Sequence, residues 1–152
     1  PEGSLSECYP IDAVAAVREA CEVVGPALHE MGVNLELDAP EIAGFTLADP
    51  RLLSDMIEAM LRIVIADTPT GEAAKITVHE DTRRTQITVA GGIGMAFQRL
   101  YAALESAEKL APGPFRTIGR GMAAALGWGA VVSYSSEINR GYRFVIDLRR
   151  IA

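Results

Sequence analysis

The sequence predicts an α/β (α+β) two-layer sandwich, in which helices cover one face of a mixed, mostly antiparallel sheet. Three observations support this prediction. Apolar residues recur at helical spacing in several long segments, they alternate with polar residues in several short segments, and two pairs of short segments are spaced like hairpins. Helices and antiparallel strands in this proportion pack as one helix layer on one sheet layer.

Composition and charge narrow the class of protein. The chain has 152 residues, of which 49% are hydrophobic and 22% charged, as in a folded domain. Its net charge of −6 argues against a nucleic-acid partner. It contains no apolar run long enough for direct membrane insertion and no signal peptide. Cys8 and Cys21 lack a metal-binding or redox spacing, so we expect a reducing, cytoplasmic setting.

The first residues, 1–8, are expected to be a leader or linker, and residues 9–152 one domain. Because the chain begins with Pro1 rather than Met, we expect it to be part of a longer protein. A short strand is predicted over Glu7–Asp12. From Ala13 to Met31 apolar residues follow steps of three and four, which predicts a long helix with one buried face, and Pro26 is expected to kink or break it.

Two strands and a second helix follow. Alternation predicts a half-buried strand over Val33–Asp38, and Phe45–Leu47 is a short further strand. Asp49 and Pro50 suit the N-cap and the first turn of a helix that runs to about Ala66.

The second half of the chain contains two predicted hairpins. Lys75–Glu80 and Thr85–Val89 form the first, and a glycine-rich turn follows it. Met95–Lys109 has a helical apolar stripe, which either packs on its own domain or docks a partner helix or receiver domain. A small helix over Thr117–Leu126 precedes the second hairpin, Val131–Ser136 with Tyr142–Arg149. Arg83-Arg84 and Arg149-Arg150 are small basic spots at a turn and a strand end.

This order of elements, together with three short motifs, resembles the ATP-binding catalytic domain of sensor histidine kinases. The motifs are Asp49-Pro50-Arg51-Leu52, Thr68-Pro69 before a strand, and Arg140-Gly141-Tyr142-Arg143-Phe144 in the last hairpin. The resemblance extends from about Tyr9 to Leu148 and implies a Bergerat-type (GHKL) ATPase fold. It also implies three sites of chemistry, each of which can be compared with this sequence.

The first site is the metal site on the helix before Thr68-Pro69. The resemblance implies an Asn that binds Mg²⁺ at Ile63, with its assisting residue at Ala59; a shift of one residue gives Arg62 and Glu58 instead. No Asn occurs between Pro50 and Thr70, and neither Ile nor Arg offers the oxygen ligand that Mg²⁺ requires. Glu58 and Arg62 are spaced for an ordinary intrahelical ion pair.

The second site is the glycine-rich turn, where the family has Asp-x-Gly-x-Gly. Gly92 and Gly94 fit this pattern, but Ala90 occupies the place of the acid that accepts a hydrogen bond from adenine. The third site is a Gly-x-Gly-Leu-Gly phosphate loop. Its place falls either near Phe115–Ile118 or on Gly119-Arg120-Gly121, and in both alignments the glycine run is broken.

We therefore expect a degenerate histidine-kinase ATP-binding-like domain of a two-component signalling protein. Its nucleotide pocket would be a relic formed by Glu58, Arg62, Ile63, Ala90, Gly92 and Gly94, with no catalytic residue, no metal and no cofactor. It would act as a regulatory or interaction module. The implied partners are upstream dimerisation and phosphoacceptor helices, through which a homodimer could form outside this chain, or a response-regulator receiver domain.

Two other hypotheses remain open. The domain could be divergent but functional, binding ATP with Mg²⁺ and supporting histidine autophosphorylation or phosphotransfer in the full-length protein. It could also be a small-molecule sensor that reuses the emptied pocket. We expect a cytoplasmic location, either as a free protein or as the cytoplasmic part of a larger, membrane-associated bacterial protein.

Overall fold

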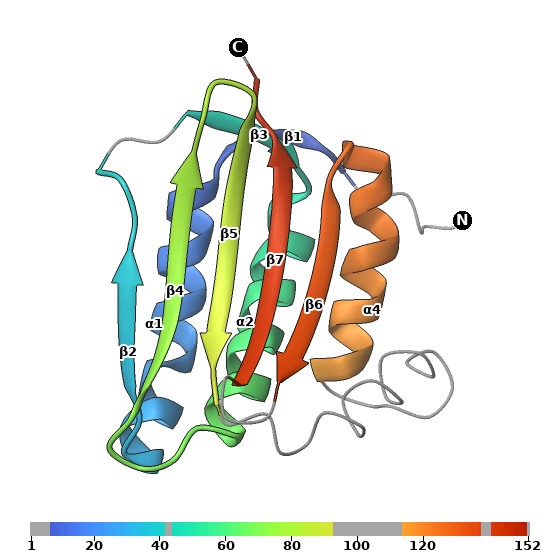
Figure 1. Cartoon of the computed structure of the whole chain (residues 1–152). Coiled ribbons are helices and arrows are strands. Elements are labelled where there is room, and N and C mark those ends of the chain that lie inside the picture. The colour runs from blue at the N-terminus through green and yellow to red at the C-terminus, as the bar shows by residue number, and fades with distance from the viewer. Residues whose placement is uncertain (1–6, 42–43, 93–113, 138–140, 152) are drawn as a thin grey trace.

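A computed structural model describes residues 7–41, 44–92, 114–137 and 141–151 (Figure 1). The elements follow one another along the chain as β1 (Tyr9–Asp12), α1 (Ala13–Met31), β2 (Asn34–Asp38), β3 (Phe45–Ala48), α2 (Pro50–Ala66), β4 (Ala73–Glu80), β5 (Arg84–Gly91), α4 (Pro114–Ala125), the 3₁₀ turn η1 (Leu126–Trp128), β6 (Val131–Glu137) and β7 (Gly141–Arg149). The stripe over Met95–Lys109 and the position of Gly94 lie outside the described residues.

The predicted two-layer sandwich is confirmed. Five strands form one sheet in the order β2-β4-β5-β7-β6, and β1 pairs with β3 in a separate two-stranded sheet. Within the larger sheet only β2 and β4 run parallel. Figure 1 shows α1 and α2 behind one face of this sheet, with α4 beside α2 at the β6 edge, while the other face of the sheet is turned to the viewer.

The first helix begins and ends where the sequence suggests. The Asp12 carboxylate accepts hydrogen bonds from the N–H groups of Val14 and Ala15, and Gly32 ends the helix with φ of 66°. Of the kink or break expected at Pro26, the break does not occur, because α1 continues through this residue. Pro26 has no N–H that could bond to the Glu22 carbonyl. Because both residues are exposed, water can bond to that carbonyl instead.

The second helix lies at the centre of the helix layer. The Asp49 carboxylate caps it by accepting hydrogen bonds from the N–H groups of Arg51 and Leu52, and it also accepts one from the N–H of Glu7. Its buried side chains meet those of the sheet in a single core, which includes Leu53, Met56, Met60, Val64, Ile76, Ile87, Phe144 and Ile146. This packing places the end of α2 beside the end of β5.

Both predicted hairpins are present, with β4 and β5 extending further than alternation indicated. Helix α4 starts at Pro114, earlier than predicted, and η1 continues it to Trp128. In the part of the chain that the structure describes, no helix is long and apolar enough to cross a membrane.

Candidate functional site

The candidate pocket positions on α2 form two different faces of that helix. Glu58 and Arg62 are joined by an ion pair of 3.1 Å, with side chains 28% and 44% exposed. Both nitrogens Nε and Nη2 of Arg62 donate to the same carboxylate oxygen of Glu58. The two side chains therefore satisfy each other at the surface of the helix, as their spacing predicted.

The alternative pair of positions on α2 is buried and apolar. Ala59 is 4% exposed and Ile63 is 8% exposed. Neither side chain has an oxygen, so this pair does not fit the Mg²⁺ site that the resemblance implies. Within the ranges described, no group of three or more His, Cys, Asp or Glu residues could hold a metal ion.

The end of β5 settles which residue faces α2. A Cβ built on Gly91 would point at the helix, 2.7 Å from Val64 Cγ1. Because side chains alternate along a strand, Ala90 lies on the opposite face, between Lys75 and Arg143 of the neighbouring strands. Counting from the glycine motif therefore places the family's acidic residue at Ala90, whereas the direction toward α2 would place it at Gly91. A carboxylate is absent from both positions.

Gly91 and Gly92, the described glycines of this turn, are required by packing within the protein itself. Besides its contact with Val64, a Cβ on Gly91 would meet the Ala74 backbone at 3.2 Å. Gly92 has φ of 80°, and a Cβ there would lie 2.6 Å from Oδ2 of Asp67. Gly141, with φ of 82°, faces the carbonyl oxygens of Gly91 and Gly92 so closely that no side chain fits. These contacts explain the glycines without a bound nucleotide.

Sequence reasoning missed Asp67, whose carboxylate lies beside the glycine turn. Asp67 is the C-cap residue of α2, and its backbone N–H bonds to carbonyls of the last helical turn. The missed signal was its position directly before Thr68-Pro69. The Thr68 hydroxyl donates to the Val64 carbonyl at 2.7 Å and fixes the chain at this point. An acidic group is therefore present at the turn, but on the helix rather than the strand.

Both proposed remnants of the phosphate loop lie within or at the start of α4. A Cβ on Gly121 would meet the Met56 side chain, with Sδ 2.5 Å away, so this glycine allows α4 to pack closely on α2. Arg116 and Arg120 are exposed. The glycine run does not form a loop at this position.

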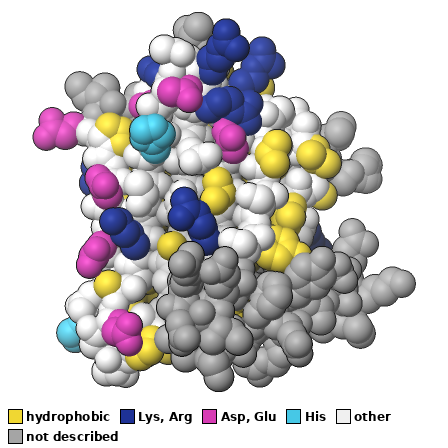
Figure 2. Space-filling model, in the orientation of Figure 1, with side chains coloured by type: hydrophobic (Ala, Val, Ile, Leu, Met, Phe, Trp, Pro, Cys, Tyr) yellow, Lys and Arg dark blue, Asp and Glu magenta, His cyan; other side chains and the backbone are white. Residues whose placement is uncertain are grey.

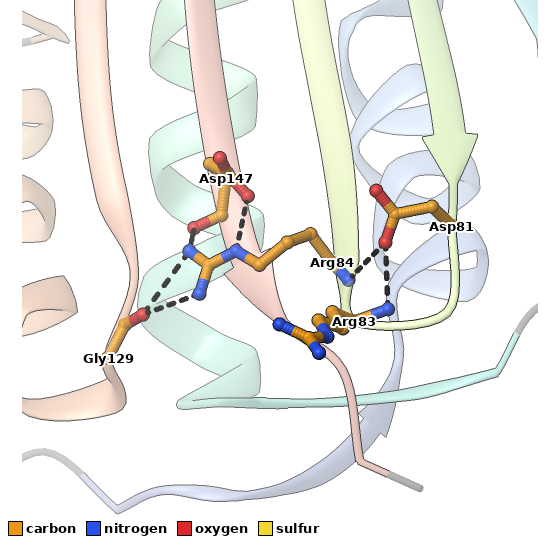
Figure 3. Close-up of polar contacts among 5 residues, drawn as sticks. All are labelled: Asp81, Arg83, Arg84, Gly129 and Asp147. Carbon is orange, nitrogen blue, oxygen red and sulfur yellow. Dashed lines mark hydrogen bonds and ion pairs between the residues drawn. The ribbon is translucent and has the colours of Figure 1, made fainter.

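A polar cluster occupies the other end of β5 (Figure 3). Nε of Arg84 donates to the Asp147 carboxylate at 2.7 Å, and its terminal nitrogens donate to the Gly129 carbonyl at 3.3 Å. Asp81 accepts from the N–H of Arg83 at 2.7 Å and of Arg84 at 2.8 Å, and these bonds lower the pKa of Asp81. Each group ties one strand or turn to the next, which is a structural role.

Comparison with solved structures identifies the fold. A crystal structure of full-length ShkA in complex with AMPPNP matches 97% of this chain and 32% of its own, with a TM-score of 0.76 and 21% identity. The catalytic domain of histidine kinase ThkA matches over 95% and 98%, with a TM-score of 0.77 and 14% identity. The mycobacterial sensor histidine kinase MprB matches over the same shares, with a TM-score of 0.76 and 15% identity.

These matches establish that the chain has the fold of histidine kinase catalytic domains, as the sequence resemblance implied. The chain spans about a third of ShkA, 32% of its length, and nearly the whole of the ThkA chain. No protein-family model matches the sequence, and no curated protein does.

Proposed function

We propose that this domain is a degenerate histidine-kinase ATP-binding-like domain that works as a regulatory or interaction module in two-component signalling. It does not bind Mg-ATP and does not transfer phosphate. Its partners are phosphoacceptor helices or a receiver domain, and it works in the cytoplasm. The observation that carries the proposal is the chemistry of the pocket walls, where neither α2 nor the end of β5 offers the groups that ATP and Mg²⁺ need.

The positions on α2 and at the end of β5 lack the metal-binding and adenine-binding groups for separate reasons. On α2, one register gives buried Ala59 and Ile63, and the other gives Glu58 already paired with Arg62. On β5, Ala90 points away from the helix and Gly91 has no side chain. Phosphoryl transfer depends on a positioned metal and on cationic groups that neutralise the developing charge. Loss of these groups together supports a silent pocket more strongly than loss of one would.

Calorimetry with ATP and ADP, each with and without Mg²⁺, tests the proposal on this chain. We expect no saturable heat in any of the four titrations. Trp128, which is 1% exposed in the core, provides a second readout through its fluorescence. Micromolar binding that requires Mg²⁺ would refute the proposal. A further variant, Ala90→Asp, should not create binding, because a side chain at this position lies on the face away from α2.

One observation favours the alternative, a divergent domain that still binds ATP. The Asp67 carboxylate lies beside Gly92, so an acid is near the place where the family anchors adenine. If the alternative holds, ATP binds to this chain and Asp67→Asn abolishes binding, while Asp55→Asn on the exposed face of α2 does not. Autophosphorylation of the full-length protein would then be lost in Asp67→Asn and retained in Asp55→Asn.

A further inference from the structure

The two edges of the five-stranded sheet differ in how they are protected. β2 at one edge exposes Glu36 and Asp38, and acidic side chains on an edge strand discourage another strand from pairing with it. β6 at the other edge has one charged residue, Glu137 at its last position, and none from Val131 to Ser136. In the described part of the chain, β6 pairs only with β7, so its outer side has no strand beside it.

We propose that the β6 edge accepts an extended acidic segment of another protein as a sixth strand of the sheet. Strand addition of this kind takes its affinity from main-chain hydrogen bonds and its selectivity from alternate side chains. The proposal names a surface for the interaction role proposed above. It does not depend on the state of the nucleotide pocket, which lies at the ends of α2 and β5.

Charge across the molecule favours an acidic partner. The described residues from 81 onward include seven of the 14 basic residues and three of the 20 acidic ones, although the whole chain has a net charge of −6. These residues supply β5, α4, β6 and β7, which form the β6 half of the sheet and its covering helix. Figure 2 shows acidic side chains mainly on the β2 side and hydrophobic side chains on the β6 side. The β6 edge belongs to the half of the sheet whose described residues include more basic than acidic side chains, although on the face in Figure 2 the Lys and Arg side chains gather at the β4–β5 hairpin end and over the middle of the sheet.

The outward face of β6 leaves room for a basic side chain to reach a guest strand. Ser133 and Ser135 are small and exposed, and Ser135 lies directly opposite the exposed Arg143 of β7. Neighbouring strands are about 4.8 Å apart, so the long Arg143 side chain can extend across Ser135 toward a carboxylate on the added strand. An added strand with acidic residues on this face would place negative charge beside Arg143.

The inward face of β6 suits apolar side chains on the guest. Val132 and Tyr134 are partly buried against the core, and the Tyr134 ring lies 6.4 Å from that of Phe144. Figure 1 shows α4 beside β6 at the outer end of the helix layer, next to where an added strand would run. The partly buried residues that flank the buried stripe of α4 are uncharged: Thr117, Gly119, Met122 and Ala124. Alternating acidic and apolar residues therefore match both faces.

A second copy of this chain fits the edge less well. The other edge of the large sheet among the described strands is β2, and pairing of β2 with β6 would be head-to-tail, which builds rings or open filaments rather than a two-fold dimer. Two β6 strands paired with each other would bring the arginines of two basic halves together. An acidic segment from a different protein avoids both problems.

Fluorescence anisotropy with a labelled peptide of four Val-Glu repeats tests the proposal, with a Val-Lys peptide of equal length as the control ligand. We expect saturable binding of the acidic peptide that weakens as salt is raised, and none of the basic one. Ser135→Glu should weaken binding about threefold to fivefold through like charges on paired strands. Arg143→Glu should weaken it further. Asn34→Glu, which adds the same charge to the exposed β2 edge, should leave it unchanged.

Amide NMR shifts and hydrogen exchange locate the bound peptide. Protection should rise in β6, and thermal melts of each variant confirm that it is folded. The proposal is overturned if the acidic peptide does not bind, if both peptides bind equally, or if the two β6-side variants have no effect. It is also overturned if shifts map away from β6 and α4, or if light scattering shows that the free chain already associates through β6. If ATP does not bind to the chain, the proposed function stands whichever of these results is obtained.

Discussion

The two ends of β5 are held in place by different kinds of interaction. At its start, Arg84 and the neighbouring turn are joined by hydrogen bonds and an ion pair to Asp147, Gly129 and Asp81. At its end, Gly91 and Gly92 are held by close contact with α2 and β7, and backbone lies almost against backbone. The polar end resembles a functional site in its chemistry, and the glycine end resembles one in its sequence motif.

Neither a polar cluster nor a glycine motif is therefore sufficient to identify a functional site. The polar groups at the start of β5 satisfy one another, so they are not poised to act on a ligand. The glycines at the end are needed for packing, so their presence is no sign of a bound phosphate or base. The candidate pocket has kept the close glycine packing at this joint, and under the proposed function it lacks the side chains for nucleotide chemistry.

The largest expected effect tests the packing role of the glycine end. In Gly141→Ala the new Cβ would collide with the carbonyl oxygens of Gly91 and Gly92, and φ of 82° is unfavourable for any other residue. Overpacking and backbone strain together should cost about 3 kcal/mol. For a domain of this size the melting temperature should fall by about 6–12 °C. Thermal unfolding followed by circular dichroism measures the change.

Gly71→Ala is the matched control for this prediction. Gly71 has a similar φ of 89°, but a Cβ there would meet nothing within 4 Å. It should lose only the strain, about 1 kcal/mol. Equal losses in the two variants would show that the carbonyl contacts of Gly141 do not matter, and the packing account of the glycine end would be wrong.

The same end of β5 shows what the sequence could and could not predict. Periodicity located α1, α2 and both hairpins, because burial of one face imposes a regular pattern on the sequence. Motif spacing located the turn but selected Ala90, since a count along the chain does not reveal which way a strand residue faces. Asp67 was missed because its nearness to Gly92 joins residues far apart in sequence. Pro26 does not end α1, because the exposed helical turn around it reduces the cost of the missing hydrogen bond.

A smaller effect is expected where two ion pairs are compared, one at each site. A double-mutant cycle with Arg84→Met and Asp147→Asn should give a coupling of about 1 kcal/mol, since the 2.7 Å contact is partly shielded. The same cycle with Arg62→Met and Glu58→Gln should give about 0.3–0.5 kcal/mol, as for exposed pairs one helical turn apart. Urea unfolding of the single and double variants measures both. A larger coupling for Glu58–Arg62 would indicate that the pocket pair is more than a surface contact.

The smallest effect concerns Asp81, in the turn before β5. Hydrogen bonds from the N–H groups of Arg83 and then Arg84 lower its pKa below the ordinary value of 3.8. A carboxylate with a lowered pKa stabilises the fold above its unfolded pKa, and this contribution disappears as pH falls through the folded value. Asp81→Asn should therefore melt below the wild type at pH 6, and the gap should close as pH drops beneath 3.8. Thr82→Asn, which leaves the carboxylate in place, should show no such closing. A gap that stays constant with pH would mean that the amide of Asn replaces the carboxylate as a cap, so that shape rather than charge holds the turn.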